Sequence, residues 1–193
     1  MTIAVAIVDG DSTVFGSDSE ISLGNKRFPA SMAERPSKWS FHGRWGICVS
    51  GDSAMGVLID RHAERWMVKD TAEDVCDSLR LLFVEHPGFQ LRVDPDGGSS
   101  TVDADMLLIR AGEAWHIDSA FNATPVLEWA TGNGLDVALG ALFASAFDFD
   151  ASPIYRVRIA LEASCEINRS CAPPLHIGRL SASGVEYLDT LHP

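Results

Sequence analysis

The sequence predicts an α+β fold of four layers, in which two packed β-sheets lie between two outer layers of helices, an αββα sandwich. Two observations predict it. Segments with strand-like alternation come first, two helical patterns follow, and strands, two more helices and final strands complete the chain. No internal repeat and no linker composition interrupts this order, so we expect residues 1–193 to form a single domain.

The chain opens with two expected β-hairpins. Apolar residues alternate on both sides of the turn-forming segment Asp9-Gly10-Asp11-Ser12, which predicts a hairpin over residues 2–19. A loop with glycine, proline and charges covers 23–36. A second hairpin is expected over 38–50, with its turn at Gly43.

Helical spacing of apolar side chains follows these hairpins. It predicts helices over residues 52–68 and 71–86 that should pack on the sheet. Met55, Leu58, His62 and Trp66 are expected on one face of the first helix, and Val75, Leu79 and Leu82 on one face of the second.

The second half of the chain repeats the same plan after a polar loop expected over 87–104. A hairpin over 105–120 and a strand over 125–132 are followed by a helix over 135–147. A second helix is opened by Ser152-Pro153, because proline is favourable at a first helical position. The closing strands are expected over 173–180 and 185–191.

Composition excludes several classes of function. The formal net charge of −12 opposes general binding to nucleic acid or to an anionic membrane surface, since both need clustered Lys and Arg. No apolar run approaches the length of a membrane span, and no basic leader precedes an apolar signal core. The four cysteines form no CxxC pair, which favours a reducing cytoplasm and buried thiols.

Metal sites and cofactors are not expected. The histidines show no HExxH or similar ligand spacing. Asp94, Asp96 and Asp105 match three positions of a calcium loop, but Ser99 stands where that loop needs glycine. We therefore expect a solvated loop there.

Thr2 is the first candidate for chemistry, because a strand is expected to start directly at this residue. A small second residue permits removal of Met1, and Thr2 would then carry both a hydroxyl and a free α-amine. Such an amine has a pKa of about 7.7–8.0, so it can accept the hydroxyl proton near neutral pH. One residue would thus hold a nucleophile and its base.

The surroundings of Thr2 resemble a known family. The segment from Thr2 through Asp18-Ser19-Glu20-Ile21-Ser22-Leu23-Gly24-Asn25 resembles the opening of proteasome β-subunits and of the bacterial ring protease that works with an ATP-dependent unfoldase. Lys38, leading KWSFHGRWGICVSG, matches the catalytic lysine of that family. The resemblance implies that Lys38 lowers the proton affinity of the amine and hydroxyl, while Asp18 holds Lys38 in place.

Further residues are assigned by the same resemblance. Gly51 matches the glycine whose backbone N–H stabilises the oxyanion, a task that suits preorganised backbone donors. Val49 and Ser53 flank it where family members line the pocket for the residue before the cut, with Ile21 on a neighbouring strand. Plain packing or turn roles are the alternative for these three.

The later part of the expected site departs from the family pattern. ATGNGLDVALGAL resembles the Gly-Ser-Gly segment and following helix, with Asn133 in place of the supporting serine. Ser170 corresponds to the second supporting serine, but Ile167 stands where an aspartate is expected.

The resemblance implies an N-terminal-nucleophile hydrolase of the threonine peptidase type, which cleaves peptides or unfolded proteins without a cofactor. It further implies assembly into a homo-oligomeric ring, with an ATP-dependent unfoldase as a candidate partner. A non-catalytic ring or scaffold subunit is the first alternative, motivated by Asn133 and the missing aspartate.

A serine esterase is the second alternative. Gly51-Asp52-Ser53 is similar to the nucleophile block of GDS-type esterases, and Asp189 and His192 supply the spacing of their other catalytic residues. That family, however, places the serine after the first strand of a βα repeat, whereas two β-hairpins are expected before Ser53.

Overall fold

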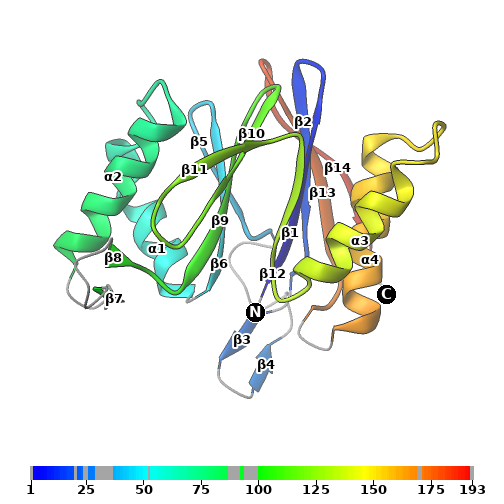
Figure 1. The fold of residues 1–193 in the computed structure, drawn as a ribbon, viewed down its shortest axis with the longest axis horizontal. Coiled ribbons are helices and arrows are strands. Elements are labelled where there is room, and N and C mark those ends of the chain that lie inside the picture. The colour runs from blue at the N-terminus through cyan, green and yellow to red at the C-terminus, as the bar shows by residue number, and fades with distance from the viewer. Residues whose placement is uncertain are drawn as a thin grey trace.

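Two five-stranded antiparallel sheets lie face to face between two pairs of helices in the computed structural model of the chain (Figure 1). The structure describes residues 2–19, 21–23, 26–28, 37–51, 53–86, 92–93, 100–168 and 171–191. This arrangement confirms the four-layer αββα fold expected from the order of the elements.

Sheet one carries the start of the chain. Its strand order, with bounds, is β12 (Glu128–Gly132), β1 (Ile3–Asp9), β2 (Ser12–Ser17), β13 (Leu175–Ser181) and β14 (Gly184–Leu191). Strand β1 pairs on both sides, with β2 and with β12. The start of the chain is therefore fixed between two neighbours.

Sheet two and two small hairpins contain the other strands. The order in sheet two is β11 (Ala123–Val126), β10 (Glu113–Ile117), β9 (Ala104–Arg110), β6 (Trp45–Gly51) and β5 (Trp39–His42). The small pairs are β3 (Ile21–Leu23) with β4 (Lys26–Phe28) and β7 (Arg92–Val93) with β8 (Ser100–Thr101). Both small pairs lie within or at the edge of segments that were expected to be loops.

Each sheet has its own helical cover. The helices α1 (Ser53–Arg61) and α2 (Ala72–Glu85) pack on sheet two, and α3 (Leu135–Ser145) and α4 (Pro153–Ile167) pack on sheet one (Figure 1). Strand alternation explains the layering. Ile3, Val5 and Ile7 face the helices, whereas Ala4 and Ala6 face sheet two. Each fully buried Ile contributes about 1.5–3 kcal/mol to stability.

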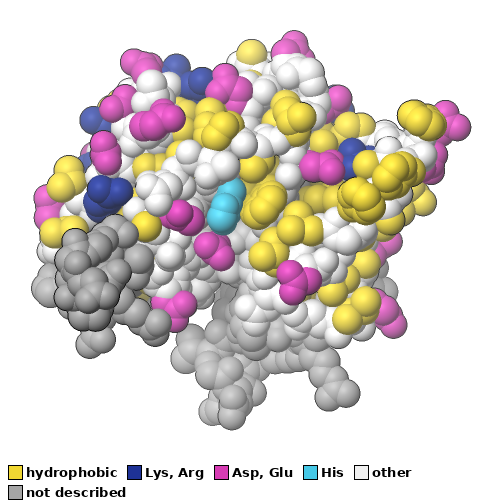
Figure 2. All heavy atoms as spheres, viewed as in Figure 1, with side chains coloured by type: hydrophobic (Ala, Val, Ile, Leu, Met, Phe, Trp, Pro, Cys, Tyr) yellow, Lys and Arg dark blue, Asp and Glu magenta, His cyan; other side chains and the backbone are white. Residues whose placement is uncertain are grey.

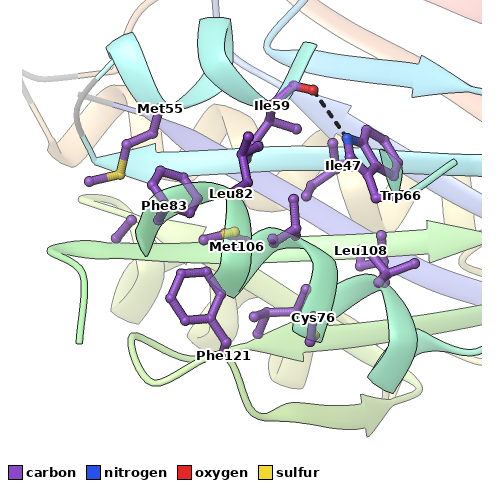
Figure 3. Packing of buried hydrophobic residues seen from close by; sticks show 14 of the residues in the cluster. Ile47, Met55, Ile59, Trp66, Cys76, Leu82, Phe83, Met106, Leu108 and Phe121 are labelled. Atoms are coloured by element: carbon purple, nitrogen blue, oxygen red, sulfur yellow. Dashed lines mark hydrogen bonds between the residues drawn. The ribbon is translucent and has the colours of Figure 1, made fainter. Parts of the chain in front are cut away.

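The helix expected over 52–68 is interrupted. α1 ends at Arg61, His62 leaves helical geometry with φ −114° and ψ 30°, and a 3₁₀ turn (Ala63–Arg65) follows. The turn brings Trp66 back under α1, where its indole N–H donates to the carbonyl of Ile59 at 3.1 Å (Figure 3). The helical spacing of apolar residues continues through the break because α1 and the segment after it pack on the same apolar core.

The strand expected over 125–132 is two strands in different sheets. β11 ends at Val126 in sheet two and β12 begins at Glu128 in sheet one. Leu127 between them is exposed, and its carbonyl accepts a hydrogen bond from the N–H of Val8 at 2.8 Å. The apolar alternation continues across this crossover, which is why the sequence pattern did not show it.

Candidate active site

Thr2 lies at one end of the space between the two sheets. It directly precedes β1, and the alternation that turns Ala4 and Ala6 towards sheet two places Thr2 on the same face. The residue is 8% exposed, and its carbonyl accepts a hydrogen bond from the N–H of Asn133 at 2.9 Å. A residue so close to the chain start is thus held by backbone pairing.

Asp18 and Lys38 form an ion pair beside this position. Asp18 follows β2, Lys38 precedes β5, and the Lys38 ammonium lies 2.6 Å from Asp18 Oδ1. The same carboxylate oxygen accepts the N–H of Ile3 at 3.0 Å. One oxygen therefore links the lysine ammonium to the backbone immediately after Thr2.

The Asp18 carboxylate is held from several directions. Its side chain is fully buried, and its second oxygen accepts the N–H of Ala172 at 3.5 Å. Lys38 is anchored through its own N–H, which donates to the Ser17 hydroxyl at 3.3 Å. A buried charge is tolerated only when donors and an opposite charge compensate for lost hydration, as they do here.

Cys48 lies close enough to this pair to feel both charges. It is fully buried on β6, and burial raises the pKa of its thiol to about 12, with a smaller opposing effect of Lys38 and a further upward effect of Asp18. The thiol therefore stays neutral at physiological pH and is no candidate nucleophile.

Gly132 permits the backbone to close on Thr2. Its φ is +105°, and a Cβ at this position would lie 1.9 Å from the Thr2 carbonyl oxygen. Only glycine fits both the angle and the contact. Gly51, at the end of β6, is constrained in a similar way, with φ +145° and a would-be Cβ 2.6 Å from the carbonyl oxygen of Asp103.

The end of α4 supports the turn that contains Asn133. The side-chain amide of Asn168 donates to the Asn133 carbonyl, and the buried Ser164 hydroxyl reaches the Gly134 carbonyl at 3.2 Å. Both residues were missed in the sequence. Asn168 comes one position after Ile167, which stands in the place of the expected aspartate. This neighbouring polar residue was the feature of the sequence that could have indicated a supporting role.

A pocket of about 430 Å³ opens beside these residues, lined by Ser50, Gly51, Val102, Asp103, Ala104, Asp105, Ser119, Gly132 and Asn133. It joins the end of β6 to the turn that holds Thr2. The acidic wall, Asp103 and Asp105, was not recognised in the sequence, where Asp105 was considered only as part of a failed calcium loop. Among the residues described, no group of three or more His, Cys, Asp or Glu could hold a metal ion.

Comparisons with known proteins bear on the fold of the chain. No protein-family model matches the sequence, and a search of curated proteins found no match. Solved structures do match. Thiobacillus denitrificans BPH, a β-proteasome homologue, in complex with Epoxomicin superposes with a TM-score of 0.78 over 93% of this chain and 98% of that chain, at 15% sequence identity. A second structure of Thiobacillus denitrificans BPH gives a TM-score of 0.77 at 15% identity, covering 94% and 98% of the two chains.

The chain has the fold of a proteasome-like N-terminal-nucleophile hydrolase.

The proteasome-like fold excludes the βα repeat of GDS-type esterases. Every strand pairing among the described residues is antiparallel. Ser53 begins α1 over sheet two, whereas Asp189 lies on β14, the edge strand of sheet one, and His192 lies outside the described residues. Within the described residues, no helix is both long and apolar enough to cross a membrane.

Of the three residues expected to line the substrate pocket, the structure describes the side chain of one. Val49 is half-buried and packs against the apolar core under α1. Ile21 lies on β3 and Ser53 opens α1, but their side chains fall outside the described part of the structure. Ser170 also lies outside the described residues. The structure therefore brings together Thr2, Asp18, Lys38 and Asn133, with Gly51 lining the adjoining pocket.

Proposed function

We propose that the protein is a threonine-type endopeptidase that uses Thr2 as its nucleophile once Met1 is removed. The observation that supports this most directly is the buried Asp18–Lys38 pair, which shares a carboxylate oxygen with the backbone N–H that follows Thr2. A buried ion pair is seldom more stabilising than an apolar pair of the same shape, so its position beside Thr2 supports a chemical role in addition to a structural one.

In the proposed reaction, the Thr2 hydroxyl oxygen attacks the carbonyl carbon of a peptide bond and its proton passes to the α-amine of the same residue. The Lys38 ammonium favours the unprotonated amine, and the Gly51 N–H stabilises the oxyanion. The C–N bond then breaks, and the amine leaves with the transferred proton. Water hydrolyses the remaining ester, which restores the free hydroxyl.

Asn133 and Asn168 have supporting roles in this proposal. Neither amide titrates, so neither can relay a proton. They hold the turn against Thr2 through the Asn133 N–H and the Asn133 carbonyl. Assembly into a homo-oligomeric cytoplasmic ring, with or without an ATP-dependent unfoldase, is part of the same proposal, because an unselective protease is safe only when access is restricted.

The test compares Thr2→Ala and Thr2→Ser with the wild type. All three second residues are small, so Met1 removal is permitted in each, and intact mass checks it. We expect the wild type to cleave fluorogenic peptides, Thr2→Ser to retain measurable cleavage, and Thr2→Ala to fall to background. Epoxomicin should inhibit the wild type. Cleavage that survives in Thr2→Ala, or that proceeds with Met1 retained, would refute the proposal.

A non-catalytic ring subunit is the second candidate, favoured by the two untitratable side chains Asn133 and Asn168. It predicts a ring-sized particle by light scattering and no peptide cleavage after complete Met1 removal.

A further inference from the structure

The pocket beside Thr2 has an acidic wall. Asp103 directly precedes β9 and Asp105 lies on it, and the same pocket is lined by Gly132 at the end of β12 and by Asn133 after it. They are the charged side chains among its described lining residues. The pocket also includes Gly51, so it directly adjoins the proposed site of bond cleavage.

Asp105 has one described charged neighbour and remains accessible. Its side chain is 48% exposed, and Nε2 of His116 lies 3.6 Å from Oδ1. The His116 ring packs against Trp129 with 5.2 Å between ring centroids, which limits its movement. Figure 2 shows acidic side chains beside a histidine near the middle of the face of the molecule that it draws.

The Lys38 ammonium, which belongs to the proposed site, is already compensated by a carboxylate. Lys38 is paired with the fully buried Asp18 carboxylate, so it contributes little positive potential to offset Asp103 and Asp105. The net charge of −12 adds a general attraction for cations.

We propose that this pocket receives a Lys or Arg side chain of the bound peptide, so that cationic peptides are the preferred ligands of the site. For substrate cleavage, this inference rests on the proposed peptidase function. The binding preference can be measured independently of cleavage. A cation in the pocket gains two carboxylate partners, whereas an acidic side chain meets like charge.

Binding is measured with Thr2→Ala protein and three capped tripeptides that differ only in a central Arg, Leu or Glu. We expect the Arg peptide to bind on the order of tenfold more tightly than the Leu peptide, since each partly exposed pair contributes a few-fold. The Glu peptide should bind most weakly. The preference should shrink at 0.5 M salt, where exposed charges are screened within roughly 4–5 Å.

Substitutions then test whether Asp103 and Asp105 cause the tighter binding of the Arg peptide. Asp103→Asn/Asp105→Asn should bring the Arg to Leu ratio towards one, and Asp105→Lys should favour the Glu peptide. Glu162→Gln, which removes an exposed carboxylate on α4, should keep the wild-type ratio. Circular dichroism and thermal unfolding check that each variant is folded.

The outcomes separate this inference from the peptidase proposal. Equal binding of the Arg and Leu peptides, or a preference that survives in folded Asp103→Asn/Asp105→Asn protein, overturns the inference even if the wild type cleaves peptides. A preference that depends on the two aspartates, in a wild type that cleaves nothing, supports the pocket assignment and refutes the peptidase.

Discussion

Breaking the ion pair between Lys38 and Asp18 should destabilise the protein far more than removing an ordinary surface lysine. The lysine side chain is 16% exposed and the aspartate side chain is fully buried. Lys38→Met leaves a carboxylate without its cation in the interior, where loss of one partner costs about 3–5 kcal/mol. We expect about 3 kcal/mol, because the N–H groups of Ile3 and Ala172 still donate to Asp18.

A double-mutant cycle in urea isolates the pair. Unfolding at pH 7 is followed by tryptophan fluorescence for Lys38→Met, Asp18→Asn and the double variant, with a check that the m-value is unchanged. The double variant should cost about 1–2 kcal/mol less than the sum of the two single changes, since it buries no unpaired charge. Lys69→Met is the matched control, because the contacts described for Lys69 use its backbone, and it should cost under about 0.5 kcal/mol. Additive single effects, or a cost of Lys38→Met no larger than that of Lys69→Met, would refute the reasoning.

Two further predictions concern a close backbone contact and a buried thiol. Gly132→Ala should cost more than about 2 kcal/mol of stability and disrupt the Thr2 site, because its Cβ would overlap the Thr2 carbonyl oxygen. Gly140→Ala on α3 is the control, because a Cβ there meets open space, and it should stabilise the protein by about 0.5–1 kcal/mol. Thermal unfolding measures both variants, and equal effects would contradict the prediction. Cys48, whose thiol pKa burial raises to about 12, should resist iodoacetamide at pH 8.5 in the folded protein and react once urea unfolds it, as peptide mass mapping would show. The unfolded thiol has a pKa of about 8.5, so the stability due to the neutral buried thiol is complete below that pH and is lost as the pH rises towards 12. Modification of Cys48 in the native protein at pH 8.5 would contradict the prediction that burial keeps the thiol neutral and inaccessible.

The layers of the fold could be predicted because each element has one buried face. Ile3, Val5 and Ile7 alternate with Ala4 and Ala6, and both sets are buried on opposite faces of sheet one. The break at His62 and the crossover at Leu127 could not be predicted, because each depends on where two distant elements meet. Apolar periodicity reports burial and does not say which sheet or helix supplies it.

The candidate site was predictable only where residue type carries the chemistry. Thr2, Asp18 and Lys38 came from recognisable segments, and the structure brings the last two into an ion pair. Asn168 acts through a bond to a backbone carbonyl, which leaves no mark in the sequence beyond a polar residue after a helix. The acidic wall depends on the register that places Gly51 opposite Ala104, and a sequence pattern cannot supply that register.

The contact between Ala172 and Asp18 links the two ends of the chain in time as well as in space. During synthesis, the first strand leaves the ribosome long before α4 and the segment that follows it. Asp18 acquires this donor, and the turn at Asn133 acquires its brace from Asn168, only when nearly the whole polypeptide has emerged. The surroundings of Thr2 that the proposed function requires are therefore complete only late in synthesis, when the segment after α4 has joined Asp18 and Asn133.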